Sequence, residues 1–97
     1  MRYRLHPEAA AEHKRQVAWY EERQAGLGRR YHAEYLSALA LALAAPHRYK
    51  IVRQPAIRRI GFRVFHFDLI YREAGGVVEV LAVAPQRREP SYWASRL

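Results

Sequence analysis

Residues 65–84 read FHFDLIYREAGGVVEVLAVA, and this stretch decides the fold of the chain. In its first part, aromatic and aliphatic side chains at the odd positions alternate with polar ones at the even positions, with Ile70 as the one exception. That period of two is typical of a strand with one buried face, which we expect over residues 64–72. Gly75 and Gly76 suit a hairpin turn that needs positive φ, and the nearly continuous apolar run after them is typical of a central strand. The stretch therefore predicts a β-hairpin at the centre of a sheet.

Two helices are expected upstream of this hairpin, over residues 7–24 and 27–45. The first opens with Pro7 and Glu8, a proline and an acid that suit the first turn of a helix. Apolar side chains then recur at the helical period in both segments, and Pro46 closes the second. Because the joint between the segments is short and contains glycine, the two helices are predicted to form an antiparallel hairpin.

The remaining segments complete the predicted order of elements. A short first strand is expected over residues 2–5, a loop over 47–55, a short basic strand over 57–60, and a helical turn within residues 90–96. The order is strand, helix, helix, strand, strand, strand. The prediction is an α+β fold in which the helix hairpin packs on one face of a mostly antiparallel four-stranded sheet and leaves the other face largely open.

Composition and charge narrow the class of protein. A chain of 97 residues with 51% hydrophobic and 27% charged side chains is expected to form one folded domain, residues 1–97. There is no cysteine, no signal peptide and no apolar run of membrane-spanning length, so a cytoplasmic protein without membrane contact is expected. The net charge is +8, and residues 46–97 carry +6 of it. Such a field suits a nucleic acid, an acidic protein surface or an acidic peptide, although a solvated surface without a ligand is the alternative.

The tail after the last strand combines cations with aromatic side chains, a mixture that suits interface hot spots. These candidate binding residues are Arg87, Arg88, Tyr92, Trp93 and Arg96. The alternative is structural: Arg87 pairs with Asp68 or Glu89, and the aromatic side chains cap the core.

Two further sets of residues are candidates for partner surfaces. The first is a basic cluster, Arg58, Arg59 and Arg63, which is either a partner site or a charged edge that discourages strand-to-strand aggregation. The second is apolar. Trp19 points away from the apolar face of the first helix, and Leu36 and Leu43 widen that of the second, which together predict a protein interface.

The five histidines show none of the spacings typical of metal ligands, and the chain has no glycine-rich phosphate loop, so neither a metal nor a cofactor is expected. His13 is predicted to be a histidine at the edge of the core.

The order of elements resembles that of the RelE/ParE toxins of bacterial type II toxin–antitoxin systems, which include plasmid-stabilisation proteins. The stretches that carry the resemblance are residues 6–9, 19–22, 26–28, 57–59, 65–71, 80–83 and 87–93, which extend over essentially the whole chain. The resemblance implies a growth-inhibiting toxin in a heteromeric complex with a cognate antitoxin. Under this resemblance, Trp19, Leu36 and Leu43 become candidate antitoxin-binding residues, and the basic and tail residues become candidates for binding the cellular target.

The match at one position bears on the mechanism. In the branch that cuts messenger RNA on the ribosome, the third strand carries an arginine that stabilises the scissile phosphate, and the position here that matches it is Asp68. A carboxylate repels a phosphate. The other catalytic positions of that branch match Arg87 and Tyr92, with Arg58 or Arg59 in place of its basic second strand.

This departure favours the ParE-like branch, whose members bind and poison DNA gyrase. Two alternatives stay open at this point: a ribosome-dependent endoribonuclease, in which Arg59, Arg87 and Tyr92 are the catalytic candidates, and a basic nucleic-acid-binding module without toxicity.

Overall fold

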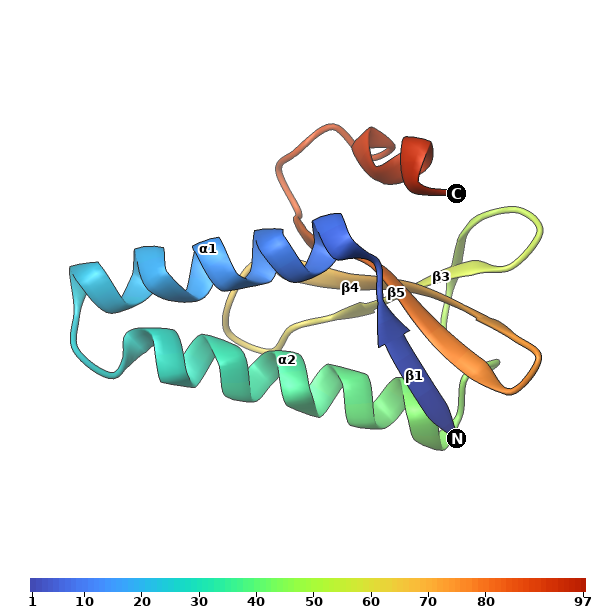
Figure 1. The fold of residues 1–97 in the computed structure, drawn as a ribbon, viewed down its shortest axis with the longest axis horizontal. Helices are drawn as coiled ribbons and strands as arrows, with labels where there is room; N and C mark the ends of the chain where they lie inside the picture. The colour runs from blue at the N-terminus through green and yellow to red at the C-terminus, as the bar shows by residue number, and fades with distance from the viewer.

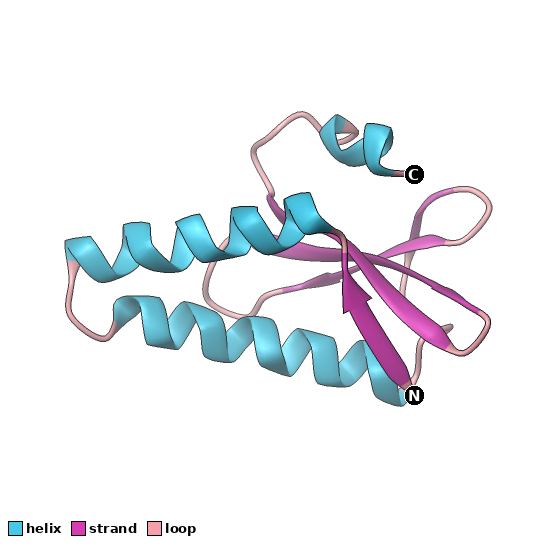
Figure 2. Ribbon diagram, viewed as in Figure 1, coloured by secondary structure: helices cyan, strands magenta, loops and turns pink.

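A hairpin of two helices packs on a twisted sheet in the computed structural model, which describes residues 1–97 (Figures 1 and 2). The elements are β1 (Arg2–Leu5), α1 (Pro7–Arg23), α2 (Leu27–Ala44), β2 (Ile51–Arg53), β3 (Ile57–Gly61), β4 (Phe67–Ala74), β5 (Val77–Pro85) and the 3-10 helix η1 (Tyr92–Arg96). The α+β class and the helical turn in the tail are confirmed. No helix of the chain combines the length and apolar character that crossing a membrane requires.

The sheet has five strands in the order β1-β5-β4-β3-β2, so the expectation of four strands was wrong. Three of its pairings are antiparallel and only β1 runs parallel to its neighbour β5, which confirms a mostly antiparallel sheet. The additional strand, β2, lies within the segment expected to be a loop. It has three residues and an irregular register with β3. So short an edge strand offers no period for sequence analysis to detect.

The central hairpin is formed by β4 and β5, and its turn has positive φ at Gly75 (60°) and Gly76 (79°), as predicted. Strand β4, however, begins at Phe67 rather than at residue 64. The reason lies on α2. The carboxylate of Glu34 accepts hydrogen bonds from the backbone N–H groups of Arg63 and Val64 at 2.8 and 2.9 Å, which holds this segment as a turn.

The joint between the helices depends on a close approach. A Cβ atom at Gly28 would collide with the backbone carbonyl of Val17, so a side chain at this position would push the two helices apart. The carboxylate of Glu21 accepts hydrogen bonds from the backbone N–H groups of Gly26 and Gly28 and so closes the turn. The helices end one residue earlier than expected, at Arg23 and Ala44.

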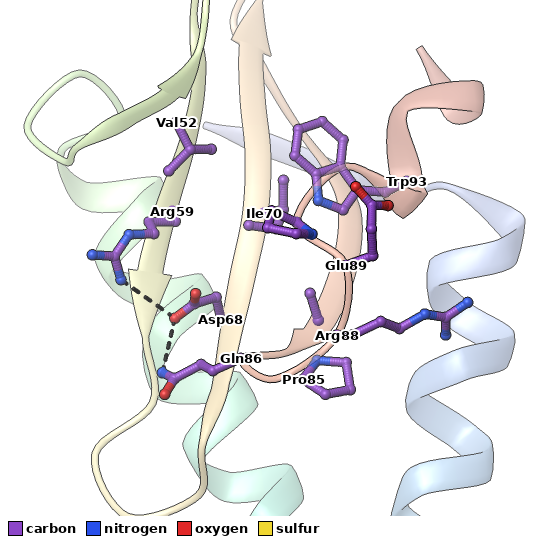
Figure 3. Close-up of a pocket in the computed structure, with 11 residues that line it drawn as sticks. Val52, Arg59, Asp68, Ile70, Pro85, Gln86, Arg88, Glu89 and Trp93 are labelled. Atoms are coloured by element: carbon purple, nitrogen blue, oxygen red, sulfur yellow. Dashed lines mark hydrogen bonds and ion pairs between the residues drawn. The ribbon is translucent and has the colours of Figure 1, made fainter.

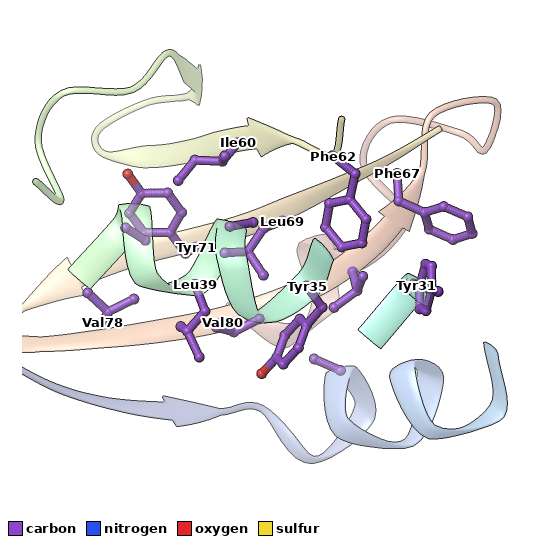
Figure 4. Close-up of a cluster of buried hydrophobic side chains, with 14 residues drawn as sticks. Tyr31, Tyr35, Leu39, Ile60, Phe62, Phe67, Leu69, Tyr71, Val78 and Val80 are labelled. Atoms are coloured by element: carbon purple, nitrogen blue, oxygen red, sulfur yellow. The ribbon is translucent and has the colours of Figure 1, made fainter. Parts of the chain in front are cut away.

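The main core fills the space between the helix hairpin and one face of the sheet (Figure 4). Aromatic side chains dominate it, and Tyr31 from α2 lies against Phe62 and Phe67 with ring centroids 5.5 and 5.0 Å apart. Tyr71, also fully buried, donates its hydroxyl hydrogen to the carbonyl of Pro46 at 2.9 Å. The odd-numbered apolar residues of β4 therefore form the buried face that the sequence pattern predicted.

The opposite face of the sheet was expected to be open, and this was wrong. Trp93 of η1 is only 3% exposed and packs there in a second buried cluster with Ile57, Ile70, Leu81, Ala82 and Ala84. Ile70, the exception in the alternating pattern, thus points into this second cluster. The tail folds back because burying the Trp93 side chain against this cluster is more favourable in free energy than leaving it exposed to water.

Candidate functional site

A groove of about 260 Å³ lies on this tail-covered face of the sheet, between strands β2–β4 and the segment that follows β5 (Figure 3). Apolar side chains, Ile70 and Trp93 among them, line its base. Four charged side chains surround it: Arg59 and Asp68 from the sheet, and Arg88 and Glu89 from the tail. The groove therefore brings together residues that sequence analysis assigned to separate candidate sets.

Asp68 is the centre of a small polar network in this groove (Figure 3). Its Oδ1 accepts a hydrogen bond from Nε2 of Gln86 at 3.1 Å and lies 3.6 Å from a guanidinium nitrogen of Arg59. The Asp68 side chain is 16% exposed and that of Arg59 is 39% exposed, so the arginine largely neutralises a carboxylate that solvent reaches poorly. Arg59 is thus occupied by Asp68, and Arg87 is not the partner of Asp68.

The tail residues separate into two kinds. Arg87 and Arg88 are exposed and form no ion pair, and the guanidinium of Arg88 lies over the ring of Tyr92, 3.7 Å from its centroid. The Tyr92 ring itself is half-buried. Burial, and then the negative charge of Glu12, raise the pKa of the Tyr92 hydroxyl to about 12.

Arg96 and Trp93 fasten the tail to the rest of the molecule. The guanidinium of Arg96 donates to both carboxylate oxygens of Glu12, at 2.9 and 2.7 Å, and to the carbonyl of Leu81 at 3.0 Å. Its side chain is only 7% exposed, and hydrogen bonding to Glu12 raises its pKa. Removing one partner of a buried pair commonly costs about 3–5 kcal/mol of stability. Trp93 and Arg96 are therefore buried residues that hold the tail in place, whereas Arg87 and Arg88 are its exposed arginines.

The predicted basic cluster is dispersed by the structure. Successive side chains of a strand point to opposite faces, so Arg58 and Arg59 diverge. Arg58 donates to the carbonyl of Tyr49 at 2.8 Å, whereas Arg59 lies in the groove beside Asp68. Arg63 lies in the turn held by Glu34, with its side chain exposed and without an ion pair.

The three residues predicted to bind an antitoxin do not form one patch. Trp19 is 47% exposed, but the guanidinium of Arg23 lies 3.6 Å from its ring centroid. Leu36 is 49% exposed, whereas Leu43 packs partly against the main core. Trp19 lies close to the helix joint and Leu43 at the far end of α2, so roughly 18 Å of helix axis separates them at 1.5 Å per residue.

A second groove, of about 350 Å³, runs along the helix hairpin and was not expected from the sequence. Leu5, Ala10, Val17 and the paired histidines His13 and His32 line it, together with Lys14. The two imidazoles form a hydrogen bond of 2.8 Å between Nε2 of His13 and Nδ1 of His32.

His13 is 7% exposed, which agrees with the prediction of a core-edge histidine. Burial, and then the charge of His32, lower the pKa of His13 to about 4, so the His13 side chain is uncharged at neutral pH. His32 carried no signal in the sequence, because only the fold places it beside His13.

No group of three His, Asp or Glu side chains in the chain is arranged to hold a metal ion. The groove beside Asp68 is lined by hydrogen-bonding and apolar side chains and by opposed charges that balance one another.

Comparison with known proteins gives the family. No curated protein matches the sequence. The family model described as the ParE toxin of the type II toxin–antitoxin system parDE matches residues 3–90, from β1 to the segment just before η1. Because this match covers nine-tenths of the chain and the fold is that of a helix hairpin on a mostly antiparallel sheet, the chain belongs to the ParE toxin family of type II toxin–antitoxin systems.

Proposed function

We propose that this toxin inhibits growth by binding DNA gyrase and poisoning it, and that it does not cut RNA. The observation that carries the proposal is the network around Asp68. At the position where RNA-cutting relatives are expected to place an arginine, this chain has a carboxylate held by Arg59 and Gln86.

The electrostatics of the groove support a role other than phosphate chemistry. Two carboxylates, Asp68 and Glu89, offset the two arginines that line it, so its formal charge is zero. Stabilising a phosphate in a cleavage reaction requires preorganised positive charge where negative charge develops. Tyr92, another of the catalytic candidates, is half-buried with a pKa of about 12, which is far from the value that suits general acid–base catalysis at neutral pH.

The surface proposed to bind gyrase is the exposed part of the tail. Arg87 and Arg88 stand on a segment that is anchored at its far end by Trp93 and by the pairing of Arg96 with Glu12. Arginine beside an aromatic ring on a rigid support is typical of interface hot spots, because little conformational freedom is lost on binding.

The proposal is tested with purified gyrase and supercoiled plasmid DNA. We expect the toxin to convert the plasmid to enzyme-linked broken DNA, and we expect no cleavage of messenger RNA on ribosomes. Messenger RNA cleavage without any effect on gyrase would contradict the proposal.

We further propose that the antitoxin neutralises the toxin by packing on the groove of the helix hairpin. The groove is apolar, and Leu36 extends it because this residue lies one helical turn beyond His32 on the same side of α2. An apolar groove next to a large exposed leucine suits the apolar side of an antitoxin helix.

Leu36→Glu is expected to weaken antitoxin binding at least about 30-fold, since removal of an interface hot spot costs about 2 kcal/mol or more. Leu41→Glu is the matched control: Leu41 is 47% exposed on the same helix but points about 140° away around its axis. Calorimetric titration of each folded variant with the antitoxin measures the difference. Equal affinities for the two variants would place the antitoxin elsewhere.

A further inference from the structure

A continuous stretch of the chain carries only positive charge. Between Glu34 and Asp68 there is no acidic residue, whereas six arginine or lysine residues occur there. The β2–β3 hairpin lies in the middle of this stretch. It projects at the end of the molecule opposite the helix joint, close to the turn that connects β4 and β5 (Figure 1).

Three cations of this hairpin and of the segment leading into it have no acidic partner. Arg48, Lys50 and Arg53 are exposed, and none of them forms an ion pair. The other two arginines of the hairpin are engaged internally, Arg58 with the carbonyl of Tyr49 and Arg59 with Asp68. The hairpin is thus held by one set of arginines and exposes another set of cations.

The acids of the protein do not reach these cations. With the exception of Glu22, every acid is occupied by a basic side chain or a backbone N–H group. Glu73 comes to this end of the molecule, and it contacts His47 at 3.1 Å and the N–H of Gly76 at 3.0 Å. No internal carboxylate therefore neutralises Arg48, Lys50 or Arg53.

We propose that the β2–β3 hairpin binds duplex DNA, with Arg48, Lys50 and Arg53 contacting backbone phosphates. Strand β3 is paired with β4 on its other side, so the edge strand β2 and the β2–β3 turn are the parts of the hairpin that DNA can approach. Three residues of extended chain separate Lys50 from Arg53 by about 10 Å, and a duplex carries one phosphate for about every 1.7 Å of its axis when both strands are counted, so each cation can reach a phosphate.

The surface around these cations favours DNA over an acidic protein as the partner. A protein interface needs an apolar centre from which charges are depleted. Around these three cations Val52 is the exposed large apolar residue, and its side chain lines the groove beside Asp68 on the tail-covered face of the sheet. A regular array of phosphates needs no such centre, because release of counterions drives binding. This DNA contact goes beyond the proposed gyrase binding and does not depend on it.

The test measures binding of the full chain to a fluorescent DNA duplex of about 20 base pairs over a series of salt concentrations. The hairpin variant is Arg48→Gln, Lys50→Gln, Arg53→Gln. The control variant is Lys14→Gln, Arg29→Gln, Arg30→Gln, which removes the same charge from exposed positions on the two helices. Thermal unfolding of both variants verifies that they fold.

We expect the hairpin variant to reduce the steepness of the plot of log K against log salt by about 2.7, since each lost phosphate contact removes about 0.9. The control variant should leave the steepness unchanged. Arg53→Gln alone, which replaces one exposed cation, should reduce the steepness by about 0.9. This single variant tests the proposal if the triple variant does not fold. Equal losses in the two triple variants would overturn the proposal, because binding would then follow net charge only. Polyglutamate bound as tightly as DNA, with the same loss in the hairpin variant, would overturn it as well.

Discussion

If the toxin binds gyrase as proposed, the Arg87→Ala, Arg88→Ala variant is expected to lose at least about 100-fold of its inhibition of this enzyme and to become non-toxic in growing cells. Two hot-spot arginines at the centre of an interface commonly account for 2 kcal/mol or more each. Its stability should fall only modestly, because neither side chain forms an ion pair and the stacking of Arg88 on Tyr92 is exposed to solvent. An exposed cation–π contact contributes about 0.5–1 kcal/mol, which shifts the melting temperature of a domain of this size by about 5 °C.

The controls for this experiment separate a binding role from a structural one. Arg29→Ala, Arg30→Ala removes the same charge from the exposed start of α2 and should leave toxicity intact. Trp93→Ala, unlike the Arg87, Arg88 variant, should lower the melting temperature strongly, since losing a buried tryptophan costs about 3–5 kcal/mol of stability. Full toxicity of the Arg87, Arg88 variant would remove both arginines from the active surface. A collapse of its melting temperature would assign them a structural role.

The second large effect concerns RNA. On programmed ribosomes the toxin should cleave messenger RNA at no more than the background rate, because loss of one preorganised charge donor typically costs about 10² to 10³ in rate and an opposed charge costs more. Asp68→Asn is the informative variant. It keeps the shape of the side chain and its contact with Gln86 but removes the negative charge beside Arg59.

This variant also should not cleave RNA, since asparagine removes the negative charge beside Arg59 without supplying the positive charge that phosphate chemistry requires at that position. Codon-specific cleavage by the wild-type toxin would show that Asp68 is not decisive. Cleavage gained by Asp68→Asn would show that the groove retains catalytic geometry and that only the carboxylate suppresses it.

Much of the fold could be predicted because the controlling patterns are local. The alternating residues before Gly75 and Gly76 predicted the central hairpin, and the proline and glycine positions predicted the limits of both helices to within one residue. The strand β2 was not predicted because three residues at a sheet edge are too few to show an alternating pattern of polar and apolar side chains. The start of β4 was misplaced because Glu34, on a distant helix, captures the backbone of Arg63 and Val64.

The candidate sites were harder to predict because they depend on contacts between distant residues. Arg96 looked like one more exposed tail arginine, but 84 positions earlier in the sequence Glu12 supplies its carboxylate partner. Ile70 looked like an exception on a polar face, but the returning Trp93 gives it a second core to pack in. Asp68 was singled out by resemblance, whereas its neighbours Arg59 and Gln86 were brought to it only by the fold.

The most direct test of the proposed mechanism is a DNA cleavage assay with purified gyrase, ATP and supercoiled plasmid, followed by denaturation and protease treatment. We expect broken plasmid DNA to accumulate with the wild-type toxin, to be absent when the antitoxin is added first, and not to form with the Arg87→Ala, Arg88→Ala variant. Undisturbed gyrase activity at toxin concentrations that arrest translation on purified ribosomes would contradict it.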